Sequence, residues 1–425
     1  MGVVPVPNIL FARPNGEMMD IPDIKMAGRS GNSFLEPLEE ELIPLPEGAS
    51  LVAVPYRYPV GISQKNGEFL RVTTNPYRRK KEEIWAVGAL LPQGFTRTLL
   101  PAFSGDRSKP LPLFGYTAVG VKNGRFVVAA CQTDEHRLWH PVNYHKKELP
   151  SLVEEKLSTF PENRLLKQLG KCALEYGCFT AQNIFYERWE GGIPVSPACN
   201  AQCIGCISAQ PAECCPSPQS RLGFVPTLKE VTEIAIPHLA KGEGAIISFG
   251  QGCEGEPSLQ AELIGASIQK IRQTVDQGTI NINTNGGNTK KLKLIVDAGI
   301  DAIRLSMVSA VPEIYQAYHR PQSYTFDNVR DSLQYAAAAG VYVSLNLLHF
   351  PGVTDDASQV EALIKIIKET GVRKIQLRNL NIDPDVFLQI IPGQFDNPLG
   401  VTQMISVLKE EIPQLDIGNY SRPVE

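Results

Sequence analysis

Hydrophobic and polar residues follow one repeated pattern from residue 227 onward. Short apolar runs alternate with longer segments in which apolar residues recur every three or four positions. The runs are typical of buried strands, and the periodic segments are typical of amphipathic helices. Because a parallel strand needs a crossover to return to the same end of the sheet, this alternation predicts a parallel sheet covered by helices.

The pattern defines the individual elements of this sheet. Five helices are expected at residues 227–240, 259–275, 290–298, 326–339 and around 360–367. Six strands are expected at residues 192–198, 244–250, 279–285, 302–308, 341–348 and 374–380. Six such units could close most of a barrel, so the predicted fold class is α/β, with a partial (β/α)6 TIM-like barrel.

The residues before the barrel have a different pattern, with prolines, glycines and short β-type runs up to about residue 150. Asn123 and Gly124 stand between two apolar runs, which indicates a β-hairpin. The first forty residues show little periodicity and are expected to form an extended arm. The predicted domains are a β-rich N-terminal domain (1–150), a connector of one or two helices (151–190), the barrel (191–395) and a helical C-terminal extension (396–425).

Composition and charge narrow the classes of protein that need to be considered. The 425 residues are 43% hydrophobic and 20% charged, with a formal net charge of −4, which is typical of a soluble globular protein. The one basic run, at residues 78–81, is followed at once by Glu82 and Glu83, so charge does not indicate nucleic-acid binding. The sequence shows no signal-peptide pattern and no apolar run of membrane-helix length, so we expect a cytoplasmic protein without a membrane partner.

Three closely spaced cysteines are the most informative motif. Cys199, Cys203 and Cys206 follow the first expected strand, and soft thiolates at this spacing bind iron–sulfur clusters or zinc. Three thiolates hold three irons of a four-iron cluster and leave the fourth iron open to another ligand. A structural zinc site would instead need a fourth ligand, such as Cys214 or Cys215. Plain packing of buried thiols is the third alternative.

Polar residues also follow the other expected strands. Because the carboxyl ends of parallel strands meet at one edge, such residues should line a single pocket there. Taken alone, each of these residues could equally cap a helix or form a turn. Together they indicate a polar site above an apolar barrel, formed by Glu254, Gly255, Glu256, Thr284, Asn285, Ser306, Asn346, His349, Gln376 and Arg378.

With these motifs in place, residues 192 to about 392 resemble the radical S-adenosylmethionine (SAM) superfamily. The resemblance implies that Cys199, Cys203 and Cys206 bind a 4Fe-4S cluster, that Gly255 and Glu256 contact the methionine amino group, and that Ser306 binds the ribose. It further implies a SAM pocket lined by Thr284, Asn285, Asn346, His349, Gln376 and Arg378. Two positions depart from the family pattern: Gly205 stands where an aromatic residue is common, and Glu254 replaces a second glycine.

The resemblance also implies a function. Such an enzyme takes one electron from a reductant such as flavodoxin or ferredoxin and cleaves SAM to a 5′-deoxyadenosyl radical, which acts on a substrate. No catalytic side chain is identified, and a peptide, protein or RNA is the expected substrate. The alternative function is a regulatory or scaffold protein that binds an iron–sulfur cluster or zinc without turnover.

Other cysteines and histidines are open to two interpretations. Cys214, Cys215 and Cys253 could hold an auxiliary iron–sulfur cluster, although packing is the simpler expectation. Cys172 and Cys178 are expected to be packed thiols. Cys131, His136, His140 and His145 lie close in sequence, but the interleaved Trp139 and Tyr144 favour an aromatic loop over a metal site.

Overall fold

The chain divides into two compact units in the computed structural model, which describes residues 6–111, 114–135, 137–209 and 219–424. The first unit comprises Met1–Glu135, His349–Val360 and Arg378–Glu410. The second comprises His136–Leu348, Glu361–Leu377 and Glu411–Glu425. Each unit therefore takes in segments that are far apart in the sequence.

The first unit is built on antiparallel strands. Eleven of the described strands form one sheet, with the main order β10-β14-β13-β9-β1-β2-β7-β12, and β3, β4 and β11 form a second sheet. The strands are β1 (Asn8–Ala12), β2 (Met18–Met26), β3 (Gly28–Ser30), β4 (Ser33–Leu35), β5 (Leu42–Pro44), β6 (Ser50–Val54), β7 (Arg57–Ser63), β8 (Phe69–Arg71), β9 (Trp85–Leu90), β10 (Phe95–Arg97), β11 (Leu100–Pro101), β12 (Phe103–Gly105), β13 (Thr117–Lys122) and β14 (Arg125–Gln132). The β-rich region predicted for this part of the chain is confirmed.

Two local predictions in this unit have opposite outcomes. The hairpin is confirmed, because Lys122 pairs with Arg125 and both turn residues, Asn123 and Gly124, have positive φ angles. The prediction of an extended arm over the first forty residues was wrong, since β1 pairs with β2, β9 and β13. Both faces of this strand are covered, so residues 9–12 are all buried and lack the alternation that marks a half-exposed strand.

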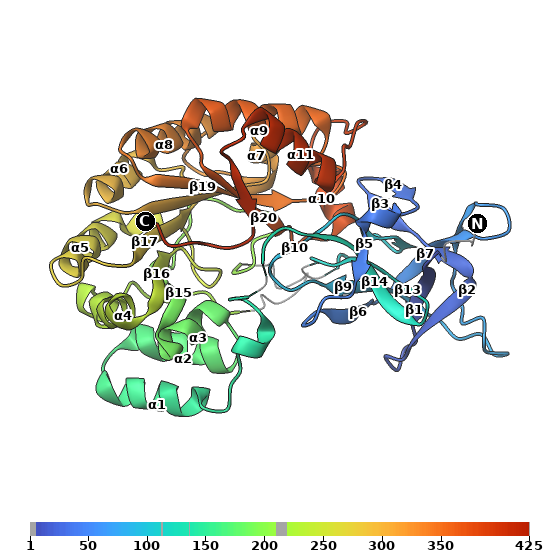
Figure 1. The fold of residues 1–425 in the computed structure, drawn as a ribbon, viewed down its shortest axis with the longest axis horizontal. Helices are drawn as coiled ribbons and strands as arrows, with labels where there is room; N and C mark the ends of the chain where they lie inside the picture. The colour runs from blue at the N-terminus through green and yellow to red at the C-terminus, as the bar shows by residue number, and fades with distance from the viewer. Residues whose placement is uncertain (1–5, 112–113, 136, 210–218, 425) are drawn as a thin grey trace. The chain divides into compact units, whose positions relative to one another are not determined.

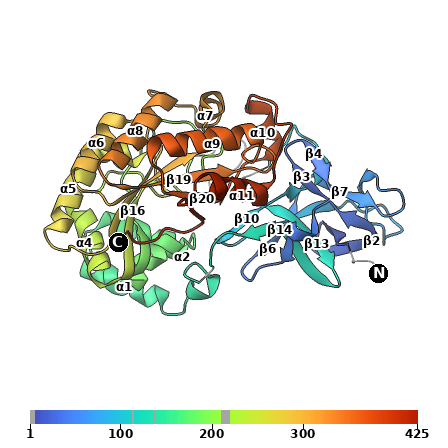
Figure 2. The same ribbon diagram turned by 45° about the horizontal axis from the view of Figure 1, so that its top comes forward.

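The second unit contains a parallel sheet with helices packed along it. Its strand order is β15-β16-β17-β18-β19-β20-β21, with β19 and β20 ending at the boundary of the unit. Figures 1 and 2 show helices α4, α5, α6 and α8 following one another along the outside of this sheet. The strands are β15 (Arg188–Gly192), β16 (Glu243–Phe249), β17 (Thr279–Thr284), β18 (Ala302–Met307), β19 (Tyr342–His349), β20 (Lys374–Asn379) and β21 (Asp416–Gly418).

The helices confirm most of the predicted alternation. Thr227 begins α4 with a capping box, in which its hydroxyl accepts from the Glu230 amide and the Glu230 carboxylate accepts from the Thr227 amide. The helices are α1 (Leu149–Thr159), α2 (Arg164–Leu174), α3 (Phe179–Tyr186), α4 (Leu228–Lys241), α5 (Ala261–Arg272), α6 (Thr289–Asp297), α7 (Pro312–His319), α8 (Phe326–Ala338), α9 (Ala357–Thr370), α10 (Pro384–Ile390) and α11 (Val401–Glu411). Short 3-10 helices lie at η1 (Glu39–Glu41), η2 (Pro141–Asn143) and η3 (Pro257–Gln260).

The first strand of the parallel sheet lies earlier than predicted. It was expected at residues 192–198, but β15 ends at Gly192. Pro194 and Pro197 have no amide hydrogen for a strand ladder, so the apolar run after Gly192 continues as irregular backbone. A seventh strand, β21, was also missed because its three residues are too short to show a period.

The described residues contain no helix that is both long enough and apolar enough to span a membrane.

Candidate functional site

The cysteine loop is held against the end of α7. The amide of Gln202 donates to the carbonyl of His319 (3.1 Å), and the amide of Ile204 donates to the carbonyl of Tyr318 (3.0 Å). Ala201 forms an isolated antiparallel bridge with Pro321. These backbone contacts fix the loop at a point more than a hundred residues away in sequence, which no local pattern could have indicated.

The three thiols of this loop are partly buried and influence one another. Burial raises the pKa of Cys199 and of Cys203, and the negative charges of Glu256 and Cys206 raise both pKa values further. Within the ranges that the structure describes, no three His, Cys, Asp or Glu side chains are already arranged as a metal site. Three soft thiolates nevertheless suit an iron–sulfur cluster in their chemistry, and cluster binding stays a prediction. Cys214 and Cys215, the possible fourth zinc ligands, lie outside the described residues.

Two polar side chains that the sequence did not reveal contact these sulfurs. The imidazole Nδ1 of His319 lies 3.3 Å from the Cys203 sulfur, and an Arg221 nitrogen (Nη2) lies 3.6 Å from the Cys206 sulfur. Arg221 is oriented by Ser208, whose hydroxyl it contacts at 2.9 Å. Hydrogen bonds to ligand sulfurs tune both the orientation of the ligands and the reduction potential of an iron–sulfur cluster.

Glu254 has a structural role in the turn after β16. One of its carboxylate oxygens accepts from the amides of Val195 and Ser196 (2.8 Å each), and the other accepts from those of Gly250 and Gln251 (2.7 Å each). Burial raises the pKa of Glu254 to about 7, and the four amides oppose this shift. The Glu254 carboxylate therefore connects two backbone segments, the one that leads to the cysteines and the turn after β16.

Gly255 has no room for a side chain. The amide of Gly255 donates to the carbonyl of Ser196 (2.7 Å), and the amide of Glu256 donates to that of Ala198 (2.8 Å). A Cβ atom at Gly255 would lie 2.0 Å from the Ala198 carbonyl oxygen. The glycine therefore allows the turn after β16 to pack directly on the backbone that precedes Cys199.

Glu256 connects this turn to the end of β17. Its carboxylate accepts from the Thr284 hydroxyl, from the amide of Asn285 (2.9 Å) and from the amide of Ser258 (3.0 Å). Asn285 in turn donates from its side chain to the Asn200 side chain in the cysteine loop (2.7 Å). The ends of β15, β16 and β17 are thus joined by hydrogen bonds into one polar cluster.

The remaining predicted residues lie in two places. In the second unit, Asn346 donates to the Ser306 hydroxyl (3.1 Å), and Gln376 is buried on β20. His349 and Arg378 belong to the first unit, where the His349 ring contacts the Thr354 hydroxyl (2.6 Å) and Arg378 contacts Gln93 (3.3 Å). Their role in SAM binding, like that of Gly205 in the loop, stays a prediction.

The other cysteines and histidines have contacts of their own. A hydrogen bond between Cys172 and Cys253 lowers the pKa of Cys172 to about 7 and raises that of Cys253. The Trp139 and Tyr144 rings stack at 6.2 Å beside Tyr420, which agrees with an aromatic loop in this region. His136 lies outside the described residues.

Comparison with known proteins identifies the region that carries this site. Residues 193–375 match the family described as the Radical SAM superfamily. The chain is similar to GTP 3′,8-cyclase of Limosilactobacillus fermentum, with 25% identity over 210 residues (47% of this chain, 56% of the relative), and to that of Staphylococcus carnosus, with 24% identity over 160 residues (37% and 44%). It spans roughly half the length of these relatives. Among solved structures, methylornithine synthase matches with 16% identity and a TM-score of 0.38, covering 64% of this chain and 76% of that one.

Proposed function

Because residues 193–375 make this chain a member of the radical SAM superfamily, we propose that it is an enzyme that cleaves SAM reductively and passes a radical to a substrate. The observation that supports this function best is the hydrogen-bonded cluster around Glu256, which joins the cysteine loop to the ends of two neighbouring strands. A protein that only binds zinc through its cysteines would not need the polar residues at the other strand ends.

The proposal gives each part of the site a role. Cys199, Cys203 and Cys206 would bind the 4Fe-4S cluster, which supplies an electron to SAM and so generates the 5′-deoxyadenosyl radical. Glu256 is a better candidate than Glu254 to bind the methionine ammonium group, because backbone amides already use all four acceptor positions of Glu254. His319 and Arg221 would orient the sulfurs and tune the cluster.

The substrate and the electron donor belong to the proposal too. A peptide, protein or RNA is expected only because a β-rich unit accompanies the barrel. The relatives are named for a nucleotide, so GTP is the first compound to test. An external reductant such as flavodoxin or ferredoxin would supply the electron. An auxiliary cluster is not part of the proposal, because two of its three candidate ligands lie outside the described residues.

The deciding experiment measures 5′-deoxyadenosine after anaerobic reconstitution with iron and sulfide and reduction with dithionite. We expect wild-type protein to bind iron, show the spectrum of a reduced 4Fe-4S cluster and form 5′-deoxyadenosine. The Cys199→Ala, Cys203→Ala, Cys206→Ala triple variant should lose all three properties, whereas Cys131→Ser, on β14 in the other unit, should keep them. Fully loaded protein that forms no 5′-deoxyadenosine would favour the regulatory or scaffold function, and zinc in place of iron would favour a metal-stabilised binding protein.

A further inference from the structure

Two cysteines meet where α2 and α3 pack against the turn after β16. Cys172 lies near the C-terminal end of α2, and Cys253 lies in the turn itself, one residue before Glu254. The Cys172 and Cys253 thiols are hydrogen-bonded to each other, and neither is in a disulfide. Two thiols this close can be joined by a disulfide without a large movement of the chain.

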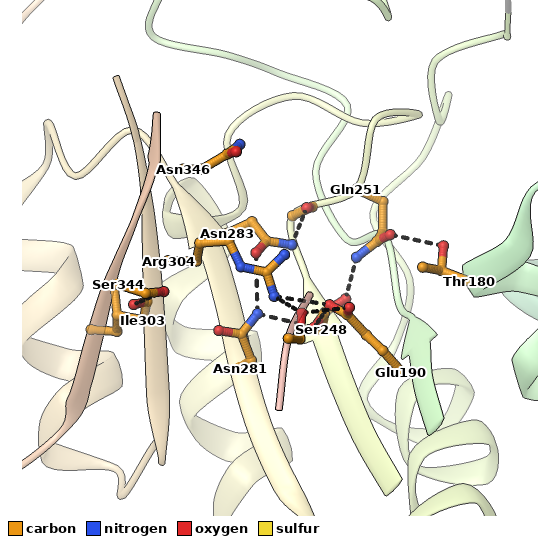
Figure 3. Close-up of polar contacts among 12 residues, drawn as sticks. Thr180, Glu190, Ser248, Gln251, Asn281, Asn283, Ile303, Arg304, Ser344 and Asn346 are labelled. Atoms are coloured by element: carbon orange, nitrogen blue, oxygen red, sulfur yellow. Dashed lines mark hydrogen bonds and ion pairs between the residues drawn. The ribbon is translucent and has the colours of Figure 1, made fainter. Parts of the chain in front are cut away.

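Hydrogen bonds outside the thiols hold the two segments together. The hydroxyl of Thr180, at the start of α3, donates to the Gln251 side chain in the turn (3.1 Å; Figure 3). The amide of Cys178, which precedes α3, donates to the carbonyl of Cys172 (3.0 Å). The surrounding structure therefore keeps the Cys172 and Cys253 sulfurs near each other, in addition to the contact that the sulfurs make themselves.

The chemistry of the pair favours oxidation. The hydrogen bond between the thiols lowers the pKa of Cys172 to about 7 and raises that of Cys253, so near neutral pH many molecules hold one proton between the two sulfurs. The Gln168 side-chain amide also donates to the Cys172 sulfur (3.5 Å) and stabilises a thiolate there. A thiolate beside a thiol supplies both the nucleophile and the second sulfur that disulfide formation requires.

Cys178 is the nearest alternative partner in this part of the chain. Its sulfur contacts the Thr180 hydroxyl (3.3 Å), and burial raises its pKa, so it is mostly protonated. Because the thiolate is the reactive form of cysteine, Cys178 is expected to react more slowly than Cys172. It therefore provides an internal control for the pair.

From this geometry we propose that Cys172 and Cys253 form a reversible redox pair, which hydrogen peroxide closes to a disulfide between α2 and the turn after β16. One sulfur attacks the peroxide as a thiolate and becomes a sulfenic acid, and one water is released. The second sulfur then displaces the hydroxyl group of the sulfenic acid, which leaves as a second water. The two sulfurs lose two electrons and the peroxide gains them. A dithiol such as dithiothreitol returns two electrons and reopens the bond.

The size of the oxidant is limited by burial. Cys172 is 1% exposed and Cys253 is 6% exposed, so the pair can be reached only from the side of Cys253. A peroxide is small enough for this approach, whereas a bulky disulfide such as oxidised glutathione is not.

The disulfide would act on the candidate site through the backbone. The turn that holds Cys253 continues to Glu254, whose carboxylate connects it to the segment before the cysteine loop, and to Gly255, which has no room for a side chain. A shift of the turn toward α2 is therefore passed on to Glu256. This consequence rests on the proposed function, in which Glu256 binds SAM, whereas the disulfide itself does not.

Peptide mapping tests the disulfide. Reconstituted protein is treated anaerobically with a stoichiometric amount of hydrogen peroxide, alkylated under denaturing conditions and digested without reduction. We expect mass spectrometry to find peptides joined through Cys172 and Cys253 in most molecules, and dithiothreitol to separate them. Cys253→Ser should form no such bond, whereas Cys178→Ser should form it as wild type does. No joined peptides in wild type, or equal joining through Cys178, would overturn the inference.

SAM binding is measured separately by anaerobic equilibrium dialysis. Oxidised wild type and oxidised Cys178→Ser should bind SAM about fivefold or more weakly than before oxidation, and dithiothreitol should restore the affinity. Oxidised Cys253→Ser should keep its affinity, because peroxide damage to the cluster would affect all three proteins alike. Unchanged affinity in fully joined wild type, or an equal loss in Cys253→Ser, would overturn the coupling to Glu256. Protein that binds no SAM before oxidation would contradict the proposed function and not the disulfide, which the peptide mapping decides alone.

Discussion

The imidazole Nδ1 of His319 lies 3.3 Å from the sulfur of Cys203. His319 ends α7 and is buried, and its backbone carbonyl also accepts a hydrogen bond from the cysteine loop. The residue therefore contacts the loop through both its backbone and its side chain. If Cys203 binds a cluster as a thiolate, an Nδ1–H group at this position would donate to the sulfur and stabilise the reduced form.

We predict that His319→Leu lowers the midpoint potential of the reconstituted cluster, because it removes this donor. His319→Asn is the matched control, since the asparagine amide nitrogen can occupy nearly the position of Nδ1 and keep most of the hydrogen bond. The measurement is a redox titration followed by electron paramagnetic resonance. Equal midpoint potentials in wild type and in both variants would exclude a role for His319 in tuning the cluster.

Gly255→Ala should disrupt the packing between the turn after β16 and the backbone before Cys199. The new methyl group would lie 2.0 Å from a backbone oxygen. A flexible side chain could rotate away from such a clash, but here the backbone itself must move. We expect a loss of about 2 kcal/mol or more in the free energy of unfolding, together with lower iron content after reconstitution. Gly223→Ala is the control, since nothing lies within 4 Å of its added Cβ. Similar stability and iron content in the two variants would contradict the packing argument.

Much of the second unit could be predicted from sequence because its signals are local. Strand and helix periods, the Thr227 capping box and the three-cysteine spacing each depend on neighbouring residues, and together they indicated the order of the elements and the centre of the site. His319 and Asn200 could not be predicted as site residues, because their partners are brought close only by the crossovers of the parallel sheet. No local spacing relates His319 to Cys203.

The domain boundaries were harder to predict for a related reason. Residues 349–360 and 378–410 follow barrel strands in sequence but belong to the first unit. The contacts responsible are long-range: Arg29 pairs with Asp385 at 2.8 Å, and the Leu111 amide donates to Asp383 at 2.6 Å. A deletion of the first 150 residues would therefore expose buried carboxylates of the C-terminal part, and it would not give an intact barrel fragment.

Asp383→Ala should destabilise the first unit strongly. The Asp383 carboxylate accepts from the Leu111 amide and lies 3.5 Å from the buried Arg57 guanidinium. Removing it leaves a buried cation and a buried amide without that partner, so we expect a loss of about 3 kcal/mol or more in the free energy of unfolding. Asp396→Ala, at an exposed position, should change stability little. Chemical denaturation of the two variants makes the comparison, and equal midpoints would show that Asp383 does not stabilise this unit.

His238 should make stability depend on pH. It is fully buried on α4, its Nε2 lies 2.9 Å from the Trp189 carbonyl, and burial lowers its pKa to about 4. An unfolded histidine has a pKa near 6.5, so as the pH falls below that value the unfolded chain gains a proton that the folded protein does not take up. Between pH 7 and pH 5 this group alone should lower the free energy of unfolding by about 2 kcal/mol.

The test compares wild type with His238→Gln by urea denaturation at pH 7 and pH 5. Glutamine can still donate to the Trp189 carbonyl but does not titrate, so the variant should lose about 2 kcal/mol less than wild type on acidification. The raised pKa of Glu254 acts in the opposite direction, because that group contributes stability at low pH that is lost as the pH rises through about 7. Its effect is common to both proteins and cancels in the comparison. An equal loss in both would show that His238 does not resist protonation in the folded chain.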